Sequence, residues 1–321
     1  MHLATDGELR AGVTILKTPD NADRTGFGSA IAAYLIWGFF PVYLLLVKAV
    51  PPAEFVGWRI IFTLPICLLI VTLRRQMATL LTALRSPRLL GWLCVSSLLI
   101  AVNWLVYVWA IQTEHVFAAS LGYYINPLVN VLLGTVFLGE KLSRLQWVAV
   151  GLAATGVALL AGGAVTMLGV SLTLAVSFGL YGLVRKQVPV GALPGLTIES
   201  ALLTLPAIGI ALYYSATPMG SAMGKDWGLS LAIVLGGFVT AIPLLLFATA
   251  ARKLPYSTLG FIQFLAPSIV FVLGLFLFKE PLRPVQAICF LFIWSAAALF
   301  VYDLLARRRK AAAEERRLTA G

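Results

Sequence analysis

Apolar residues occur along the chain in long runs that are separated by short polar segments. Each run is close to the roughly 20 residues that a helix needs to cross the hydrocarbon core of a bilayer. The pattern predicts membrane-spanning helices at about 27–47, 55–73, 89–111, 116–138, 144–162, 165–184, 194–214, 229–250, 256–278 and 283–305. We therefore expect an all-α integral membrane protein with ten transmembrane helices.

The two ends of the chain differ from these runs. Residues 1–26 mix acidic and basic side chains and contain no apolar core, so they do not resemble a cleavable signal peptide. We expect them to form a cytoplasmic N-terminal tail. Residues 306–321 are rich in Lys and Arg and are expected to form a second, basic cytoplasmic tail.

The chain also repeats itself at a spacing of 140 residues. Pro127, Gly134, Glu140, Leu142, Gln146, Ala158 and Leu159 return as Pro267, Gly274, Glu280, Leu282, Gln286, Ala298 and Leu299. The repeat divides the chain into halves at 27–163 and 164–305, each with five predicted helices. Because five is odd, the second half must enter the bilayer from the side opposite the first. Inverted repeats of this kind are typical of secondary transporters.

Composition agrees with a membrane environment, since hydrophobic residues make up 60% of the chain, charged residues 12%, and the mean hydropathy is +0.94. The formal net charge of +11 raises the possibility of a nucleic-acid partner. However, the basic residues lie in short loops between apolar helices. With the N-terminus in the cytoplasm, 19 of the 24 Lys and Arg residues fall on the cytoplasmic side and four on the other. This asymmetry favours both termini in the cytoplasm and no nucleic-acid partner.

Little in the sequence indicates metal or redox chemistry. Cys67, Cys94 and Cys289 fall inside predicted helices without ligand or redox spacing, and the two histidines are His2 and His115. A phosphate-binding Gly-x-x-x-x-Gly-Lys-Ser/Thr loop is absent from the sequence, which argues against direct use of ATP. We expect no metal and no cofactor.

Matched prolines are expected to interrupt corresponding helices. Pro65 and Pro206 lie in the second helix of each half, and Pro127 and Pro267 in the fourth. Each proline removes a backbone hydrogen bond, and the freed carbonyl has to be satisfied away from lipid. The pairing favours a central polar cavity, although transmembrane helices also tolerate single prolines in general.

Two charged residues lie inside predicted helices at nearly the same depth, Arg59 in the second helix and Glu199 in the seventh. Charges within a span usually face the bundle interior or water. Because the halves are inverted, the two residues should lie toward opposite faces and should not form a salt bridge with each other. Arg59 is a candidate substrate-binding residue, and Glu199 is a candidate proton-coupling residue. The alternatives are an Arg59 side chain that reaches the interface and a structural role for Glu199.

Other polar and aromatic residues share helical faces and are expected to line a cavity for a partly apolar small molecule. They are Tyr34, Trp37, Asn103, Tyr107, Tyr123, Asn126, Asn130, Tyr181 and Gln263. Arg185 and Lys186 could attract anionic groups, or they could be ordinary cytoplasmic anchors. Interhelical hydrogen bonding and interfacial aromatic belts are the alternative explanation for much of this set.

Small residues form a stripe on the fifth predicted helix, at Ala149, Ala153, Ala154, Ala158 and Gly162. Such stripes let helices approach closely. Packing within one chain and a homodimer through the fifth and tenth helices would both explain the stripe. Two carboxylates, Glu140 and Glu280, each precede a predicted helix and are expected to be structural, offsetting the positive end of that helix.

The chain resembles the RarD branch of the EamA family, within the drug/metabolite transporter superfamily. The resemblance rests on motifs spread over nearly all of residues 27–305: AYLIWGFFP at 33–41, SLGYYINPLVN at 120–130, FLGE at 137–140, YGLVRK at 181–186 and STLGFIQ at 257–263. It implies two inverted five-helix repeats in a bacterial inner membrane. It also implies a central cavity formed by the first four helices of each half.

A secondary carrier that exports or otherwise moves small metabolites or drugs by alternating access is the leading hypothesis, with proton coupling through Glu199. A channel is less favoured because no filter motif or ring-forming charged segment is visible. An intramembrane enzyme is also less favoured, because the predicted spans hold neither a Ser/His set nor two neighbouring carboxylates.

Overall fold

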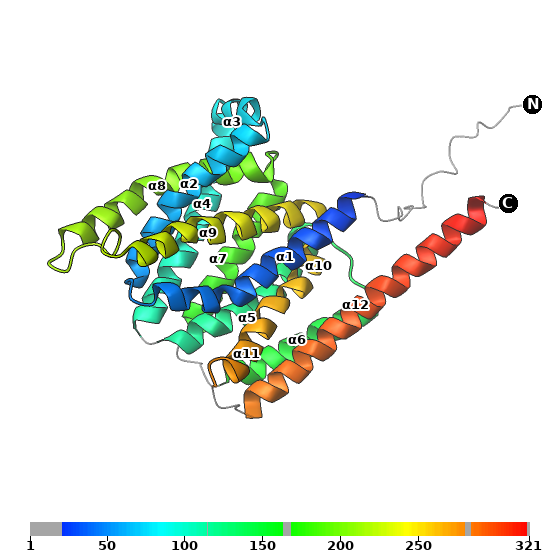
Figure 1. Cartoon of the computed structure of the whole chain (residues 1–321). Coiled ribbons are helices and arrows are strands. Elements are labelled where there is room, and N and C mark those ends of the chain that lie inside the picture. Colours follow the sequence, from blue (N-terminus) through cyan, green and yellow to red (C-terminus); the bar gives the residue numbers. More distant parts are fainter. Residues whose placement is uncertain (1–20, 114, 163–167, 280–283, 320–321) are drawn as a thin grey trace, which may run out of the picture.

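The computed structural model describes residues 21–113, 115–162, 168–279 and 284–319, and every regular element in these ranges is a helix (Figure 1). In chain order the elements are α1 (Asn21–Leu44), η1 (Leu45–Val47), α2 (Pro52–Leu73), α3 (Met77–Leu84), α4 (Pro87–Gln112), α5 (Val116–Phe137), α6 (Arg144–Ala161), α7 (Leu168–Gln187), α8 (Ala192–Ala216), α9 (Trp227–Lys253), α10 (Tyr256–Gln263), α11 (Leu265–Phe276) and α12 (Pro284–Thr319).

Ten segments of the described chain are long and apolar enough to cross a membrane, which confirms the predicted number of spans. Two departures concern the ends of spans. The connection after α2 contains the short helix α3, which the apolar pattern did not predict. The predicted basic tail at 306–321 is helical as far as Thr319, because α12 continues without a break beyond the apolar span, which ends at Arg307. Ala, Glu, Lys and Arg, which dominate that stretch, are strong helix formers and extend the helix beyond the apolar part.

The prediction that prolines interrupt matched helices is corrected by the structure. Pro65, Pro127 and Pro206 lie inside continuous helices, and among these matched prolines only Pro267 follows a break, between α10 and α11. Proline cannot donate to the carbonyl four residues earlier, which here belongs to Gln263. The chain responds with a tighter turn, in which the Phe264 amide donates to the Phe261 carbonyl at 3.3 Å. The ninth span therefore consists of two short helices.

Helix contacts repeat when the two halves of the chain are exchanged. α2 packs against α8 and α6 against α12, so each of these helices contacts its own counterpart. The contact of α1 with α9 is matched by that of α7 with α4, and the contact of α5 with α7 is matched by that of α1 with α10 and α11. The set of contacts is thus similar for the two series of five spans, while their inversion stays a prediction.

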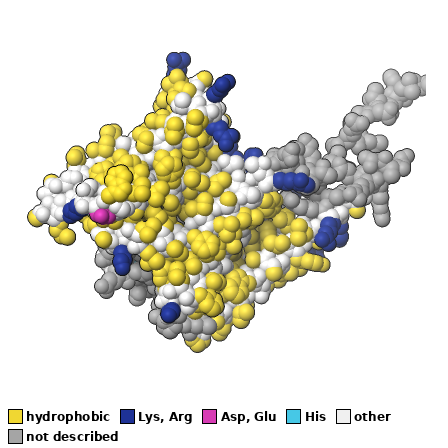
Figure 2. All heavy atoms as spheres, in the orientation of Figure 1, with side chains coloured by type: hydrophobic (Ala, Val, Ile, Leu, Met, Phe, Trp, Pro, Cys, Tyr) yellow, Lys and Arg dark blue, Asp and Glu magenta, His cyan; other side chains and the backbone are white. Residues whose placement is uncertain are grey.

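Successive spans cross the bundle in alternating directions, which gives the molecule two faces. We call the face where α1 begins the terminal face; it also carries α3 and the α7–α8 connection. The opposite face carries the α1–α2 and α8–α9 connections. Figure 2 shows hydrophobic side chains over most of the visible side of the bundle, with Lys and Arg near its margins. Side chains such as Leu205, which is 77% exposed, then face lipid.

The small-residue stripe of α6 is used inside the chain. Ala149 and Ala153 are fully buried in a cluster with Cys289 and Ile293 of α12. A Cβ atom at Gly156 would lie 2.9 Å from Phe292 Cβ, so the two backbones are as close as glycine allows. Packing within one chain accounts for this part of the stripe, and the homodimer through α6 and α12 stays a prediction.

Candidate functional site

A cavity of ≈ 260 Å³ lies between helices of both halves, lined by residues of α1, α2, α4, α5, α7, α9, α10 and α11. Its lining in α1 and α4 comes mostly from their later turns, and in α2 and α5 from their earlier turns, so it lies toward the opposite face. Seven predicted substrate-binding residues meet here: Tyr34, Trp37, Arg59, Asn103, Tyr107, Tyr123 and Gln263. Apolar and aromatic side chains such as Phe40, Trp104 and Val270 form most of the remaining wall.

Arg59 brings a positive charge into this cavity. It is the eighth residue of α2, counted from Pro52, which is roughly 10 Å along the helix axis at 1.5 Å per residue. Its Cζ lies 4.7 Å from the centroid of the Trp104 ring, a cation–π contact. Its Nε is buried and has no hydrogen-bond partner. The described residues that line the cavity include no Asp or Glu, so this charge is not neutralised by a carboxylate in the wall.

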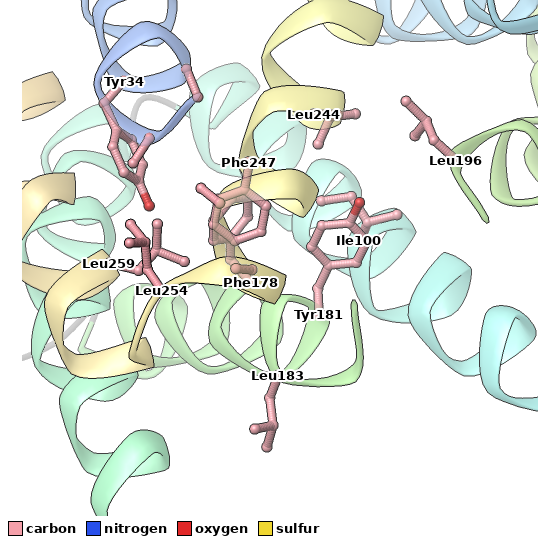
Figure 3. Packing of buried hydrophobic residues seen from close by; sticks show 14 of the residues in the cluster. Tyr34, Ile100, Phe178, Tyr181, Leu183, Leu196, Leu244, Phe247, Leu254 and Leu259 are labelled. Atoms are coloured by element: carbon pink, nitrogen blue, oxygen red, sulfur yellow. The ribbon is translucent and has the colours of Figure 1, made fainter. Parts of the chain in front are cut away.

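Aromatic rings close the cavity toward the terminal face. Phe247 of α9 lies between Tyr34 of α1 and Tyr181 of α7, with ring centroids 6.4 Å and 6.1 Å away (Figure 3). Phe178 lies 5.1 Å from Phe247, and Trp37 lies 5.7 Å from Phe178. Tyr34, Tyr181 and Phe247 are at most 1% exposed. We call these five rings the aromatic floor; they come from helices of both halves.

Gln263 lies at the joint between α10 and α11, where it lines the cavity. Its Oε1 accepts hydrogen bonds from Asn130 Nδ2 at 2.7 Å and from Tyr34 Oη at 3.4 Å. The shorter bond joins α5 to α10 across the two halves. The interruption before Pro267 therefore places a fixed amide group in the wall.

On the side of the cavity toward the opposite face, Tyr107 and Tyr123 lie edge to face with ring centroids 6.0 Å apart. Asn103 shares the wall, but its Nδ2 already donates to the Leu174 carbonyl at 2.8 Å and to Ser177 Oγ at 3.1 Å. Asn103 thus joins α4 to α7 as well as lining the cavity.

Three predicted substrate-binding residues lie outside the cavity lining. Asn126 and Asn130 are at most 1% exposed, in the part of α5 that faces other helices. Asn130 holds Gln263, whereas Asn126 Oδ1 has no hydrogen-bond partner. Tyr181 belongs to the aromatic floor and to a small second pocket that Glu199 also lines and that shares Ile100, Trp104, Thr240 and Leu244 with the cavity. A direct role of these three in substrate binding stays a prediction.

Glu199 lies in a buried polar cluster on the terminal side of the floor. It is the eighth residue of α8, counted from Ala192, so its depth matches that of Arg59 in α2. Its side chain is 2% exposed. Ser96 Oγ donates to Oε1, Tyr181 Oη donates to Oε2 at 3.4 Å, and Arg185 Nε lies 3.6 Å from Oε1. Glu199 is therefore paired with Arg185, and the described residues show no ion pair between Glu199 and Arg59.

The pairing of Arg185 with Glu199 is what sequence reasoning did not identify. The predicted helix ends at about residue 184, and from the sequence Arg185 could attract anionic groups or be an ordinary cytoplasmic anchor. In the structure α7 continues to Gln187, and the Arg185 side chain is fully buried. Its Nη2 donates to the Ala192 carbonyl at 3.0 Å. Gly195 leaves the space for the guanidinium, because a Cβ there would lie 2.1 Å from Arg185 Nη1. Its place on one helical face with Tyr181, four residues earlier, was the available signal.

Polar side chains also join separate helices at the terminal face. Lys186 Nζ donates to the carbonyls of Ala251 and Leu254 at the end of α9, at 2.9 and 2.5 Å. Arg252 Nη1 donates to the carbonyls of Val188 and Val190 in the α7–α8 connection. These contacts hold α7, α8 and α9 together where the floor is closed.

Glu140 contributes to the same face, though not as predicted. The α6 helix that follows it is capped by Ser143, whose Oγ accepts from the Gln146 amide at 3.0 Å. Glu140 instead accepts from the amides of Tyr256 and Ser257, at 2.5 and 2.9 Å, and so caps α10 in the other half. A carboxylate at a helix N-terminus is stabilising there as well. Glu280, its repeat counterpart, lies outside the described residues.

At the opposite face the described polar contacts between helices centre on Glu54, which the sequence analysis did not single out. It lies in the first turn of α2 and is 1% exposed. Its Oε1 accepts from Ser221 Oγ at 2.5 Å and from the Ala222 amide at 2.7 Å, which fixes the α8–α9 connection to α2. Its Oε2 is buried without a partner.

Comparison with known proteins places this architecture among membrane transporters. Residues 24–162 match the model of the EamA-like transporter family, a range close to the predicted first half. An uncharacterized transporter of Vibrio cholerae is 43% identical over 290 residues, which cover 89% of this chain and 95% of that protein. Protein RarD of Escherichia coli is 40% identical over 288 residues, covering 89% of this chain and 97% of RarD.

A more distant relative and a solved structure complete the comparison. The chloramphenicol-sensitive protein RarD of Pseudomonas aeruginosa is 29% identical over 287 residues, covering 88% of this chain and 95% of that protein. A crystal structure with 20% sequence identity superposes with a TM-score of 0.66 and covers 89% of this chain and 98% of its own. At that identity the superposition is evidence for the fold alone.

Proposed function

Because the chain belongs to the EamA-like transporter family, as its RarD relatives and its family match establish, it is a multi-pass membrane transporter, and we propose that it is a secondary carrier. It moves small metabolites or drugs across the bacterial inner membrane by alternating access. The proposal extends the family assignment to a mechanism, a location and a site. Its closest competitor is a channel, and an intramembrane enzyme is less favoured.

One observation carries the proposal: the cavity is lined by helices of both halves and is closed toward the terminal face by rings from both halves. A site at the interface between two repeats can be exposed first to one face and then to the other when the repeats move against each other. A cavity with one closed end is what a carrier requires in each of its two end states. A channel would instead need a continuous path.

The topology that we propose places the terminal face in the cytoplasm, with both ends of the chain on that side and the two five-helix halves, 27–163 and 164–305, inverted. The excess of Lys and Arg in the connections of the terminal face supports this orientation. The exchange of helix contacts between the halves supports a pseudo-two-fold relation. Arg185 no longer counts toward the charge excess because it is buried, but the remaining asymmetry is still large.

Glu199 is proposed as the proton-coupling residue, with Arg185 as its internal counter-ion. Buried carboxylates in transmembrane helices are frequent proton carriers, and this one has a hydroxyl, a phenol and a guanidinium around it. When the floor opens to the cytoplasm, water reaches the cluster and the carboxylate can exchange its proton. In the closed state the Arg185 guanidinium lies beside the buried carboxylate, with Nε 3.6 Å from Oε1.

Counterflow in proteoliposomes tests the carrier proposal. Vesicles that hold the purified chain are loaded with an unlabelled candidate solute and diluted into the labelled solute. A carrier transiently accumulates label against its gradient, whereas a channel only equilibrates it and an enzyme shows no flux. Saturable uptake with a counterflow overshoot is the expected result, and simple equilibration would refute the proposal.

Proton coupling needs its own experiment. An imposed pH gradient should drive transport in the natural chain and should fail to drive it in Glu199→Gln, while counterflow, which needs no net proton movement, survives in the variant. Undiminished pH-driven transport by Glu199→Gln would exclude Glu199 as the coupling residue. Ser97→Ala, which changes a buried hydroxyl without a hydrogen-bond partner beside the cluster, is the matched control.

A further inference from the structure

We propose that the substrate is a small organic monoanion with an apolar body, and that Arg59 binds its anionic group. This inference rests on the proposed carrier function and adds the charge and approximate size of the solute. It comes from three properties of the cavity: its charge, the state of the Arg59 side chain and the composition of its walls.

The charge of the described cavity wall is unbalanced. The lining residues include Arg59 and no carboxylate. Glu54, a buried acid in the same helix, accepts from the α8–α9 connection through its Oε1, and Glu199 of α8 lies beside Arg185, so the described residues show no ion pair between either acid and Arg59. A cation held within a span without a counter-ion is costly, and an anionic solute would remove that cost. The cavity lining is therefore complementary to a single negative charge.

Arg59 is also available for such a bond. Its Nε is buried with no hydrogen-bond partner. Arg185 also has buried nitrogens without a hydrogen-bond partner, but its charge is matched by Glu199, whose Oε1 lies 3.6 Å from Arg185 Nε, and its Nη2 donates to the Ala192 carbonyl. The planar guanidinium binds carboxylates through two parallel hydrogen bonds. One face of the guanidinium is already held by the Trp104 ring at 4.7 Å, which fixes its orientation.

The walls determine the rest of the solute. Trp37, Phe40, Tyr107 and Tyr123 present aromatic surface, and Gln263 offers one amide at the base. Such walls bind an apolar or aromatic body with few polar groups. The volume of ≈ 260 Å³ lies just below the roughly 300–1,000 Å³ of sites for drug-sized ligands, so a small metabolite fits better than a large drug.

Aromatic walls can also bind organic cations, which makes a cationic solute the main competitor. The structure disfavours it, because the face of Trp104 is occupied by Arg59 and a second cation would be repelled at short range.

Three probes with the same aromatic ring and different charge test the inference: phenylacetate, phenylacetamide and phenethylammonium. Their binding to the full chain in nanodiscs is followed by tryptophan fluorescence, since Trp37 and Trp104 line the cavity. Phenylacetate should bind at least about tenfold more tightly than phenylacetamide, as expected for a hydrogen-bonded charge pair, and phenethylammonium most weakly. Arg59→Gln should bring the phenylacetate-to-phenylacetamide ratio to about one, whereas Arg59→Lys should keep part of it.

Lys225→Gln is the matched control, because it removes an exposed cation from the same face outside the cavity lining. It should leave the ratio unchanged. Equal binding of phenylacetate and phenylacetamide, a preference that survives in Arg59→Gln, or no binding of any probe would each overturn the inference. Monodisperse elution of every variant separates these outcomes from misfolding. Counterflow decides the carrier proposal independently, so an anion preference without counterflow refutes the carrier and leaves the site.

Discussion

Arg59 and Glu199 occupy the same position in the second helix of their respective halves, yet their surroundings differ completely. Arg59 lines a cavity, with a buried Nε that bonds nothing. Glu199 is enclosed by Ser96, Tyr181 and Arg185 beyond the aromatic floor. Two halves with one plan thus present opposite charges at equal depth, one available to solute and the other occupied by the protein itself.

The contacts between helices at the two faces explain how a repeated scaffold is stabilised in one conformation. The described polar contacts between helices gather at the terminal face, where Lys186, Arg252 and Glu140 each bridge segments distant in sequence. The opposite face has the contacts of Glu54 and Trp58 with the α8–α9 connection and the bond from Tyr43 Oη to the Ala232 carbonyl, at 2.7 Å. The closed face is therefore the more strongly cross-linked one, and opening it requires these bonds to be released or exchanged.

The largest expected effect comes from separating the two members of the buried pair. Arg185→Leu leaves the Glu199 charge buried without a partner and should lower the free energy of unfolding by about 3–5 kcal/mol. The double variant Arg185→Leu with Glu199→Leu removes both charges and should recover most of that loss while remaining uncoupled from protons. Denaturant unfolding in detergent measures both. Equal instability of the single and double variants would show that the pair is not the dominant interaction.

Gly195→Ala also tests the contact between Arg185 and Glu199, without changing any charge. Its Cβ would collide with the Arg185 guanidinium and force it away from Glu199, at a cost of about 1–3 kcal/mol. Gly209→Ala is the control on the same helix, because its Cβ meets no atom within 4 Å, and it should gain up to about 1 kcal/mol from helix propensity. Thermal unfolding of the two variants should move in opposite directions. If Gly195→Ala left the thermal stability unchanged, the Arg185 side chain would have an alternative conformation of similar energy.

Glu140→Gln and Glu54→Gln compare the two faces directly. Each variant weakens one cross-helix contact by about 1 kcal/mol, which changes the balance of conformations up to about fivefold. Cys67 is fully buried in the terminal half of α2 and serves as a native reporter once Cys94 and Cys289 are replaced by Ser. Its maleimide labelling should accelerate in Glu140→Gln and not in Glu54→Gln. Equal acceleration would contradict the assignment of Glu140 to the closed face.

The smallest effect is expected at the base of the cavity. Gln263 accepts a bond of 2.7 Å from Asn130 and one of 3.4 Å from Tyr34. Asn130→Leu should therefore lower stability by about 1 kcal/mol, and Tyr34→Phe by less than about 0.5 kcal/mol. Differential scanning calorimetry of the two variants measures their loss of stability and so ranks the two hydrogen bonds. A larger loss in Tyr34→Phe would reverse the order of these two contacts.

The sequence predicted the number and approximate bounds of the spans, because a hydrocarbon core imposes a length and a composition that a single chain displays. It also brought together seven residues of the cavity, since helical spacing identifies a shared face. It could not identify Arg185 as the partner of Glu199, because the end of α7 lies three residues beyond the predicted end. Nor could it predict that Glu140 caps α10, since the contact joins residues 116 positions apart.

The division of the ninth span has a consequence for assembly of the protein in the membrane. α10 and α11 contain 8 and 12 residues, and at 1.5 Å per residue neither reaches across a core of about 30 Å. At their joint Pro267 cannot donate to the Gln263 carbonyl, a group that lipid cannot satisfy, and α5 of the first half lies against the joint through Asn130 and Gln263. During synthesis α10 and α11 therefore need contacts with helices that have already been inserted, such as α5. We expect the bundle to be completed in the order of the chain.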